Sequence, residues 1–156
     1  MSYSAYIVRD SIAPSGARLT TFEISLPKFL QAELNTHRQL SKNSASTRAI
    51  PTAKLIGRVT SDPVLPVYWG KNQPGMQAAT ELDALERQIA QADWLAGRDA
   101  SVSTAKKMTD AGVHKQIAGR MIEPWMFTTI IVSATDYDNF FAQRCHLDAQ
   151  PELRHV

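Results

Sequence analysis

A run of small polar and basic residues holds the densest potential for binding chemistry in this sequence. It reads Thr36-His37-Arg38-Gln39-Leu40-Ser41-Lys42-Asn43-Ser44-Ala45-Ser46-Thr47-Arg48. Hydroxyls, backbone N–H groups and a guanidinium on one loop suit a phosphate, because arginine offers a planar fork of donors. The alternative is a solvated polar loop, the more frequent origin of such a composition. His37 lies on an apolar stripe with Leu30 and Leu34, so spacing alone favours a buried core histidine over a catalytic one.

Two further segments place an arginine at the end of a helical pattern. Arg120 precedes Pro124, and by itself it would complement the helix dipole or pair with Glu123. Arg144 follows Phe140 by one turn on a mostly apolar helix, where burying a guanidinium requires an anion or a polar partner. The neighbouring Cys145 has no evident activating base, so we expect a buried small residue rather than a nucleophile.

Composition excludes several classes of protein. A chain of 156 residues predicts one domain over residues 1–156, and 17 basic against 15 acidic residues argue against a nucleic-acid-binding module. One cysteine and no Cys/His ligand spacing exclude a disulfide scaffold and a structural zinc site, so we expect no metal. No signal peptide and no apolar run long enough for a membrane span are evident, which favours a cytoplasmic protein without membrane partners.

Periodicity predicts the elements that position these residues in an α/β fold. Strands are expected at 5–8, 19–26 and 127–133, where apolar and β-branched residues alternate or cluster. Helices are expected from Pro27 to about Leu40, at 76–96 as the longest, at 101–111, at 113–122 and at 137–145. Gly97 is expected to end the longest helix. Residues 41–47 are expected to form a loop, and the proline-rich residues 51–75 an irregular surface arm.

These segments together resemble the motifs of flavin-dependent thymidylate synthases. The signature of that family is Arg-His-Arg, two residues, Ser, one residue, Asn, two residues, Ser, one residue, Arg, and here only its first arginine is replaced, by Thr36. Residues 118–124 are similar to the family's Ala-Arg-x-x-Leu-Pro segment with one insertion. Residues 139–152 are similar to its Asn-Phe-x-x-x-Arg and Ala-Gln-x-Glu segments. Two further positions depart from the family's pattern. Ser44 stands where members often have an acidic residue, and Asp148 stands where histidine is common. Members of the family are usually longer than this chain. The sequence leaves open whether the chain is a natural short form or a truncated one.

The resemblance implies a fold and an activity. The fold would be an α/β domain with a twisted, mainly antiparallel sheet and long helices, assembled as a homotetramer with shared sites. The activity would be methylation of dUMP to dTMP, with methylenetetrahydrofolate as carbon donor and FAD reduced by NADPH. Open alternatives are a same-fold enzyme that transfers a methyl or hydroxymethyl group to another pyrimidine nucleotide, and a non-catalytic descendant that binds nucleotide or flavin.

The resemblance also implies roles for individual residues. Substrate binding would fall to Glu33, Ser44, Ala45, Ser46, Thr47, Arg48, Arg120 and Arg144. FAD binding would fall to Thr36, His37, Arg38, Ser41, Asn43, Ser133, Thr135 and Asn139. Ser46, Arg48 and Arg120 would hold the 5′-phosphate. Arg144 would be catalytic, since a fixed cation beside the uracil ring stabilises the negative charge that develops on it.

Overall fold

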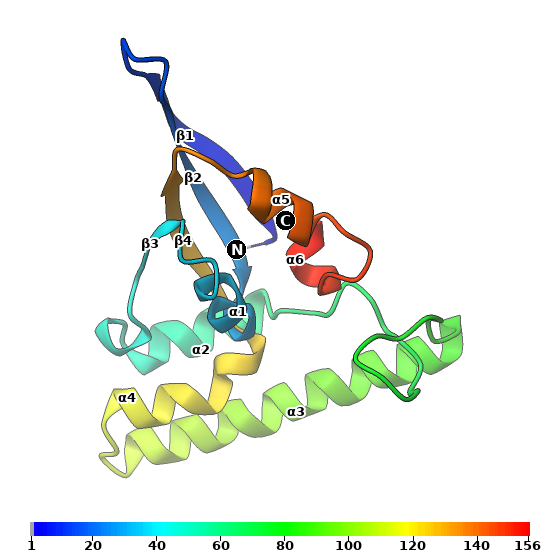
Figure 1. Ribbon diagram of the computed structural model, residues 1–156. Helices are drawn as coiled ribbons and strands as arrows, with labels where there is room; N and C mark the ends of the chain where they lie inside the picture. Colours follow the sequence, from blue (N-terminus) through cyan, green and yellow to red (C-terminus); the bar gives the residue numbers. More distant parts are fainter. Residues whose placement is uncertain (1) are drawn as a thin grey trace.

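The computed structural model describes residues 2–156 and contains a four-stranded antiparallel sheet (Figure 1). Its spatial order is β1 (Ser4–Ile12), β2 (Arg18–Pro27), β4 (Phe127–Ala134) and β3 (Ser41–Ser44). The hairpin of β1 and β2 extends beyond the other strands, and Gly16 at its turn adopts a φ of 86°, which favours glycine. The mixed fold with an antiparallel sheet and a long helix confirms the fold class expected from the sequence.

Short helices cover one face of this sheet. They are η1 (Lys28–Leu30), α1 (Gln31–Asn35), α5 (Asp138–Arg144) and α6 (Pro151–His155). The alternation in β4 turns Ile130 and Val132 inward, where they pack with Leu26, Leu34 and Leu153. Burial of this apolar surface holds α1 and α5 on the sheet, and these two helices carry much of the candidate site.

A second layer of helices lies at one end of the sheet (Figure 1). It consists of α2 (Thr52–Ser61), α3 (Ala84–Asp110), α4 (Lys115–Ala118) and η3 (Gly119–Trp125). Its core includes Leu55, Val102, Ile122 and Trp125. None of the helices between residues 2 and 156 combines the length and apolar character that crossing a membrane requires.

The first expected helix is shorter than predicted, and the loop after it is partly a strand. Helix α1 ends at Asn35, where the Thr36 hydroxyl donates to the carbonyl of Glu33 at 2.7 Å and diverts the chain into a turn. Lys42 Nζ then donates to the carbonyls of His37 and Leu40 and stabilises this turn. Residues 41–44 pair with β4 as strand β3, so the prediction of a loop was wrong for these four residues.

The prediction of an irregular surface arm over residues 51–75 was wrong for the first part of this range. Thr52–Ser61 form α2, because Leu55, Ile56 and Val59 recur at helical spacing and are buried against the second layer. The irregular segment covers residues 62–83 instead. It is folded on itself by a bridge between Gly70 and Glu81 and by a hydrogen bond from Leu82 N to Trp69 O at 2.7 Å.

Helix α3 joins two helices that the sequence predicted as separate. It begins at Ala84, where Asp83 and Glu86 form a reciprocal capping box, and it continues through Gly97. A Cβ at Gly97 would lie 3.3 Å from the Trp125 ring, so this glycine marks close helix packing rather than a helix end. The helix predicted over 113–122 is divided into α4 and η3. Strand β4 and helix α5 lie where they were expected.

Close packing at Gly70 gives a testable prediction. A Cβ there would lie 2.2 Å from the Ala78 Cβ, so Gly70→Ala must open the fold of residues 62–83. We expect a loss of about 1–3 kcal/mol in the free energy of unfolding, measured in urea, together with faster proteolysis within residues 62–83. Gly57→Ala in α2 is the matched control, because nothing lies within 4 Å of its Cβ position, and it should be neutral or stabilising. Equal stability of the two variants would contradict the prediction.

Candidate functional site

A pocket of about 310 Å³ gathers four of the residues expected to bind flavin. Thr36, His37 and Arg38 reach it from the turn after α1, and Asn139 reaches it from the first turn of α5. Phe140 supplies an aromatic wall. Hydroxyl, amide and guanidinium groups beside an aromatic ring can bind part of a planar, polar ligand. The segments that are about 100 residues apart in the sequence therefore meet in one cavity.

A larger groove of about 810 Å³ contains two of the residues expected to bind substrate, Glu33 and Arg144. Its remaining walls come from Phe29, from residues 147–150 and α6, and from the irregular segment 62–83. Tyr68 and Phe29 provide flat aromatic surface, and Gln77 and Glu152 provide polar groups. The groove thus combines two arginines, Arg144 and Arg154, with carboxylates and aromatic walls.

One hydrogen-bonded network connects the pocket and the groove. Arg144 Nε donates to His37 Nε2 at 2.6 Å, and Arg144 Nη1 donates to Glu33 Oε1 in an ion pair. The Phe140 ring packs edge-on against the imidazole at a centroid distance of 4.9 Å. The Arg144 side chain is only 18% exposed. The polar partners that a buried Arg144 requires are therefore supplied by α1 and the turn that follows it.

His37 accepts a hydrogen bond and must therefore be neutral at Nε2. Burial lowers the pKa of His37 below its ordinary value, and the nearby charges of Arg144 and Lys42 lower it further, against an opposing effect of Glu33. The ring proton consequently lies on Nδ1. His37 is buried, as its spacing predicted, but it is also part of the candidate site.

Three other residues expected to bind flavin lie on the opposite face of the sheet. Ile130 and Val132 point into the core, so Ser133 faces the other way, and its pairing partner Ser41 shares that face. Asn43 is two residues further along the same face of β3. Thr135 follows the end of β4. A single chain therefore places four of the expected flavin residues in the pocket, three on the uncovered sheet face and Thr135 beyond the end of β4.

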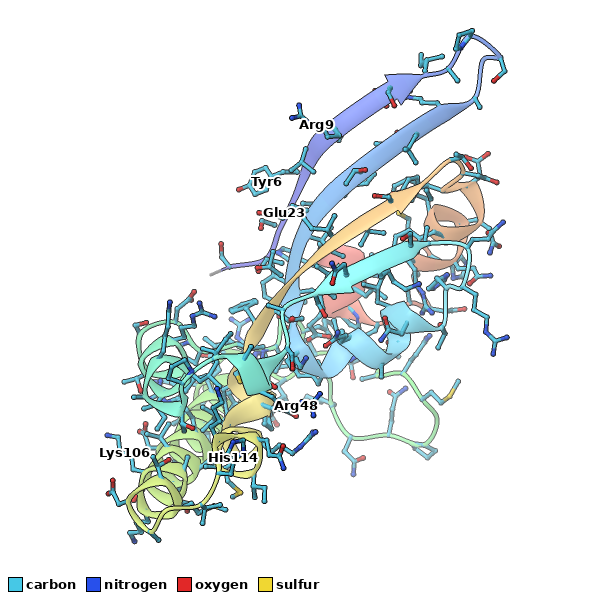
Figure 2. All side chains as sticks on the ribbon, turned by 90° about the vertical axis from the view of Figure 1, so that its left-hand side faces the viewer. Tyr6, Arg9, Glu23, Arg48, Lys106 and His114 are labelled. Atoms are coloured by element: carbon cyan, nitrogen blue, oxygen red, sulfur yellow. The ribbon has the colours of Figure 1, made fainter. Side chains whose placement is uncertain are left out.

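The residues expected to hold a phosphate lie apart from Arg144. Ser44 Oγ accepts a hydrogen bond from Gln31 Nε2 at 2.7 Å, and the loop continues through Ala45 and Ser46 into η2 (Thr47–Ala49). Figure 2 shows Arg48 where the sheet meets the helical layer, whereas α5 lies toward the other end of β4. Arg120 is 69% exposed on η3, 3.6 Å from the Glu123 carboxylate. Within one chain, Arg48 and Arg144 therefore do not lie in the same site.

Sequence reasoning missed much of the groove. Tyr68 and Gln77 belong to the segment 62–83, which has no periodicity that would place it. The signal for Glu152 was present in the Ala-Gln-x-Glu motif. Its buried carboxylate accepts a hydrogen bond from the backbone of Val67 at 3.2 Å and so attaches the segment to α6. The expectation of a buried Cys145 was wrong, because this residue follows the last turn of α5 on its exposed side.

Comparison with known proteins identifies the family. The family described as thymidylate synthase complementing protein matches residues 18–156, and the chain belongs to this family, which is the flavin-dependent thymidylate synthase family indicated by its motifs. No curated protein sequence matches the chain.

Two solved structures are similar in fold. A UMP/dUMP methylase, PolB from Streptomyces cacaoi, bound with 5-Br UMP, aligns with a TM-score of 0.74 and 14% identity over 99% of this chain and 85% of that chain. The same enzyme bound with 5-Br dUMP aligns with a TM-score of 0.63 and 15% identity, over 89% of this chain and 62% of that one. At this identity the likeness establishes the fold.

Proposed function

We propose that this protein is a flavin-dependent enzyme that methylates the uracil ring of a pyrimidine nucleotide, with dUMP as substrate and dTMP as product. The observation that carries the proposal is the hydrogen bond between His37 and Arg144. It joins the pocket formed by the family's signature residues to a groove that contains the arginine expected to meet the uracil ring. Family membership supports the reaction class.

The substrate is a uracil nucleotide in this proposal, and a second candidate is UMP. The relatives in fold are UMP/dUMP methylases, which favours a monophosphate of either sugar. The Arg144 guanidinium is a cation, and in a partly buried site it stabilises the negative charge that develops on the ring as C5 becomes nucleophilic, before C5 attacks the electrophile. The flat walls of Phe29 and Tyr68 suit a planar base.

FAD is the proposed cofactor, with NADPH and methylenetetrahydrofolate as cosubstrates. The pocket fits part of a flavin, because Arg38 and Asn139 offer donors beside the Phe140 ring. Bound flavin, once reduced by NADPH, would supply the hydride that converts the transferred methylene group to a methyl group. The chain's own contribution is to bind and orient the ligands and to hold positive charge at Arg144.

A homotetramer with shared sites is part of the proposal. Arg48 lies where sheet and helices meet (Figure 2), away from α5, the helix that ends at Arg144. A nucleotide whose phosphate binds Arg48 and whose base meets Arg144 therefore needs these groups from different copies of the chain. Both faces of the exposed strand β1 are free to contribute to such contacts, with Tyr6 62% and Ile7 59% exposed.

The visible spectrum of the purified protein tests the proposed function. We expect bound or titratable flavin absorbance and a change in it when dUMP is added, with UMP as the parallel titration. A larger response to UMP would favour the second candidate. Absence of both flavin affinity and nucleotide affinity would overturn the proposal.

Replacement of the proposed phosphate ligands should separate the two binding functions. Ser46→Ala and Arg48→Ala each remove a donor expected to meet the 5′-phosphate, and a lost charge-assisted contact costs about 1.5–3 kcal/mol. Calorimetric titration should show weaker dUMP binding by at least about tenfold for Arg48→Ala, with flavin affinity nearly unchanged. Arg18→Ala, which removes an exposed arginine of the distant hairpin, is the charge-matched control. If affinity for dUMP and affinity for flavin fell equally, the result would contradict this division of roles.

A further inference from the structure

The Arg144 guanidinium is held from two directions. Its Nε–H donates to His37, and one Nη1–H donates to Glu33, so contacts on two sides fix the plane of the group. Arginine carries five N–H donors, and among residues 2–156 these are the two hydrogen bonds that the Arg144 side chain makes. The other three donors are available to a ligand in the groove that Arg144 lines.

We propose that His37 is a positioning residue which, together with Glu33, sets the orientation of Arg144 toward the groove. This inference rests on the proposed function for the identity of the ligand that Arg144 meets. It gives His37 and Glu33 a role different from the direct flavin and substrate contacts that the family resemblance implies. The contact geometry supports it, because both acceptors belong to α1 and the turn after it, which the Leu34 side chain attaches to the core.

The hydrogen bond from Arg144 to His37 requires a neutral imidazole, with its one proton on Nδ1. The groups that face His37 are the guanidinium of Arg144, the ammonium of Lys42, the carboxylate of Glu33 and the ring of Phe140. A second proton on His37 would remove the acceptor at Nε2 and place an imidazolium against Arg144 and Lys42. The orientation of Arg144 should therefore weaken as the pH falls below the ordinary histidine range.

Two variants distinguish a positioning role from a merely structural one. His37→Gln replaces the imidazole with an acceptor that does not titrate, and His37→Phe fills the space without an acceptor. His155→Gln is the matched control, because this exposed histidine contacts Tyr3 and lines neither cavity. The first measurement is the NMR signal of Arg144 Nε–H and its exchange rate, which needs no ligand. The second is dUMP affinity by calorimetry from about pH 8 to about pH 4.5, across the histidine range.

We expect the Arg144 Nε–H signal to persist in His37→Gln and to exchange faster in His37→Phe. At about pH 8, dUMP affinity should fall about threefold to tenfold in His37→Phe and be largely retained in His37→Gln. As the pH falls, wild type and His155→Gln should lose affinity relative to His37→Gln. The nucleotide phosphate titrates near pH 6 in every sample, so only the differences between variants are interpreted.

The outcomes separate this inference from the proposed function. Unchanged Nε–H exchange in His37→Phe, or failure of His37→Gln to preserve affinity, would overturn the positioning role. A wild-type protein that binds neither flavin nor dUMP nor UMP would overturn the proposed function, and the Nε–H exchange rates would then decide the positioning role alone.

Discussion

Replacement of Arg144 by alanine is expected to slow turnover by about 10²–10³-fold. The same change should weaken dUMP binding by about tenfold or less. The uracil ring is neutral in the ground state and develops negative charge as C5 becomes nucleophilic, so a cation beside it interacts more strongly with the transition state that leads to this anionic form. Single-turnover oxidation of reduced flavin, with dUMP and methylenetetrahydrofolate, measures the rate, and calorimetry measures the affinity.

Two further variants make this test specific. Arg144→Lys keeps the charge but should restore the rate only in part, because an ammonium cannot donate to His37 and Glu33 in one plane as the guanidinium does. Arg154→Ala is the control within the same groove, since the exposed Arg154 donates to the carbonyl of Leu147, and its rate should stay within a few-fold of wild type. If Arg144→Ala keeps its rate and loses only affinity, Arg144 is a binding residue and not a catalytic one.

The sequence predicted elements whose own side chains determine them. Strand β2 alternates apolar and polar residues and β4 is rich in β-branched residues, so both were placed correctly. Strand β3 reads Ser-Lys-Asn-Ser, and its conformation depends on hydrogen bonds to β4, which no local pattern reveals. Gly97 was misinterpreted for the same reason, because its packing partner Trp125 is remote in the sequence.

The candidate site shows the same division between local and long-range information. The motifs placed His37 and Arg144 in separate segments, and the contact between them links residues 107 positions apart. The motif resemblance could indicate that both matter for binding. It could not show that one orients the other, because that depends on how α5 packs across the turn after α1. The walls of the groove were harder to predict, since Glu152 meets the irregular segment through the backbone of Val67.

The hydrophobic core beneath α1 determines where Glu33 and His37 lie. Leu34 is fully buried against Leu26 and Ile130, one residue after Glu33 and three residues before His37. A five-residue helix has little stability of its own, because nucleating a helix in isolation is unfavourable. The position of Glu33 and His37 thus depends on the packing of Leu34.

Replacing Leu34 with alanine should lower the free energy of unfolding by about 2–5 kcal/mol, measured in urea, since it leaves a cavity under α1. It should also weaken dUMP binding, although Leu34 does not line the groove, because the contacts that hold Arg144 loosen. Leu85→Ala is the matched control: this exposed leucine lines neither cavity, and its replacement should change stability by no more than about 0.5 kcal/mol. If Leu34→Ala lowers stability as expected but leaves dUMP affinity and Arg144 Nε–H exchange unchanged, the site does not depend on the packing of α1, and Arg144 must be oriented by α5 alone.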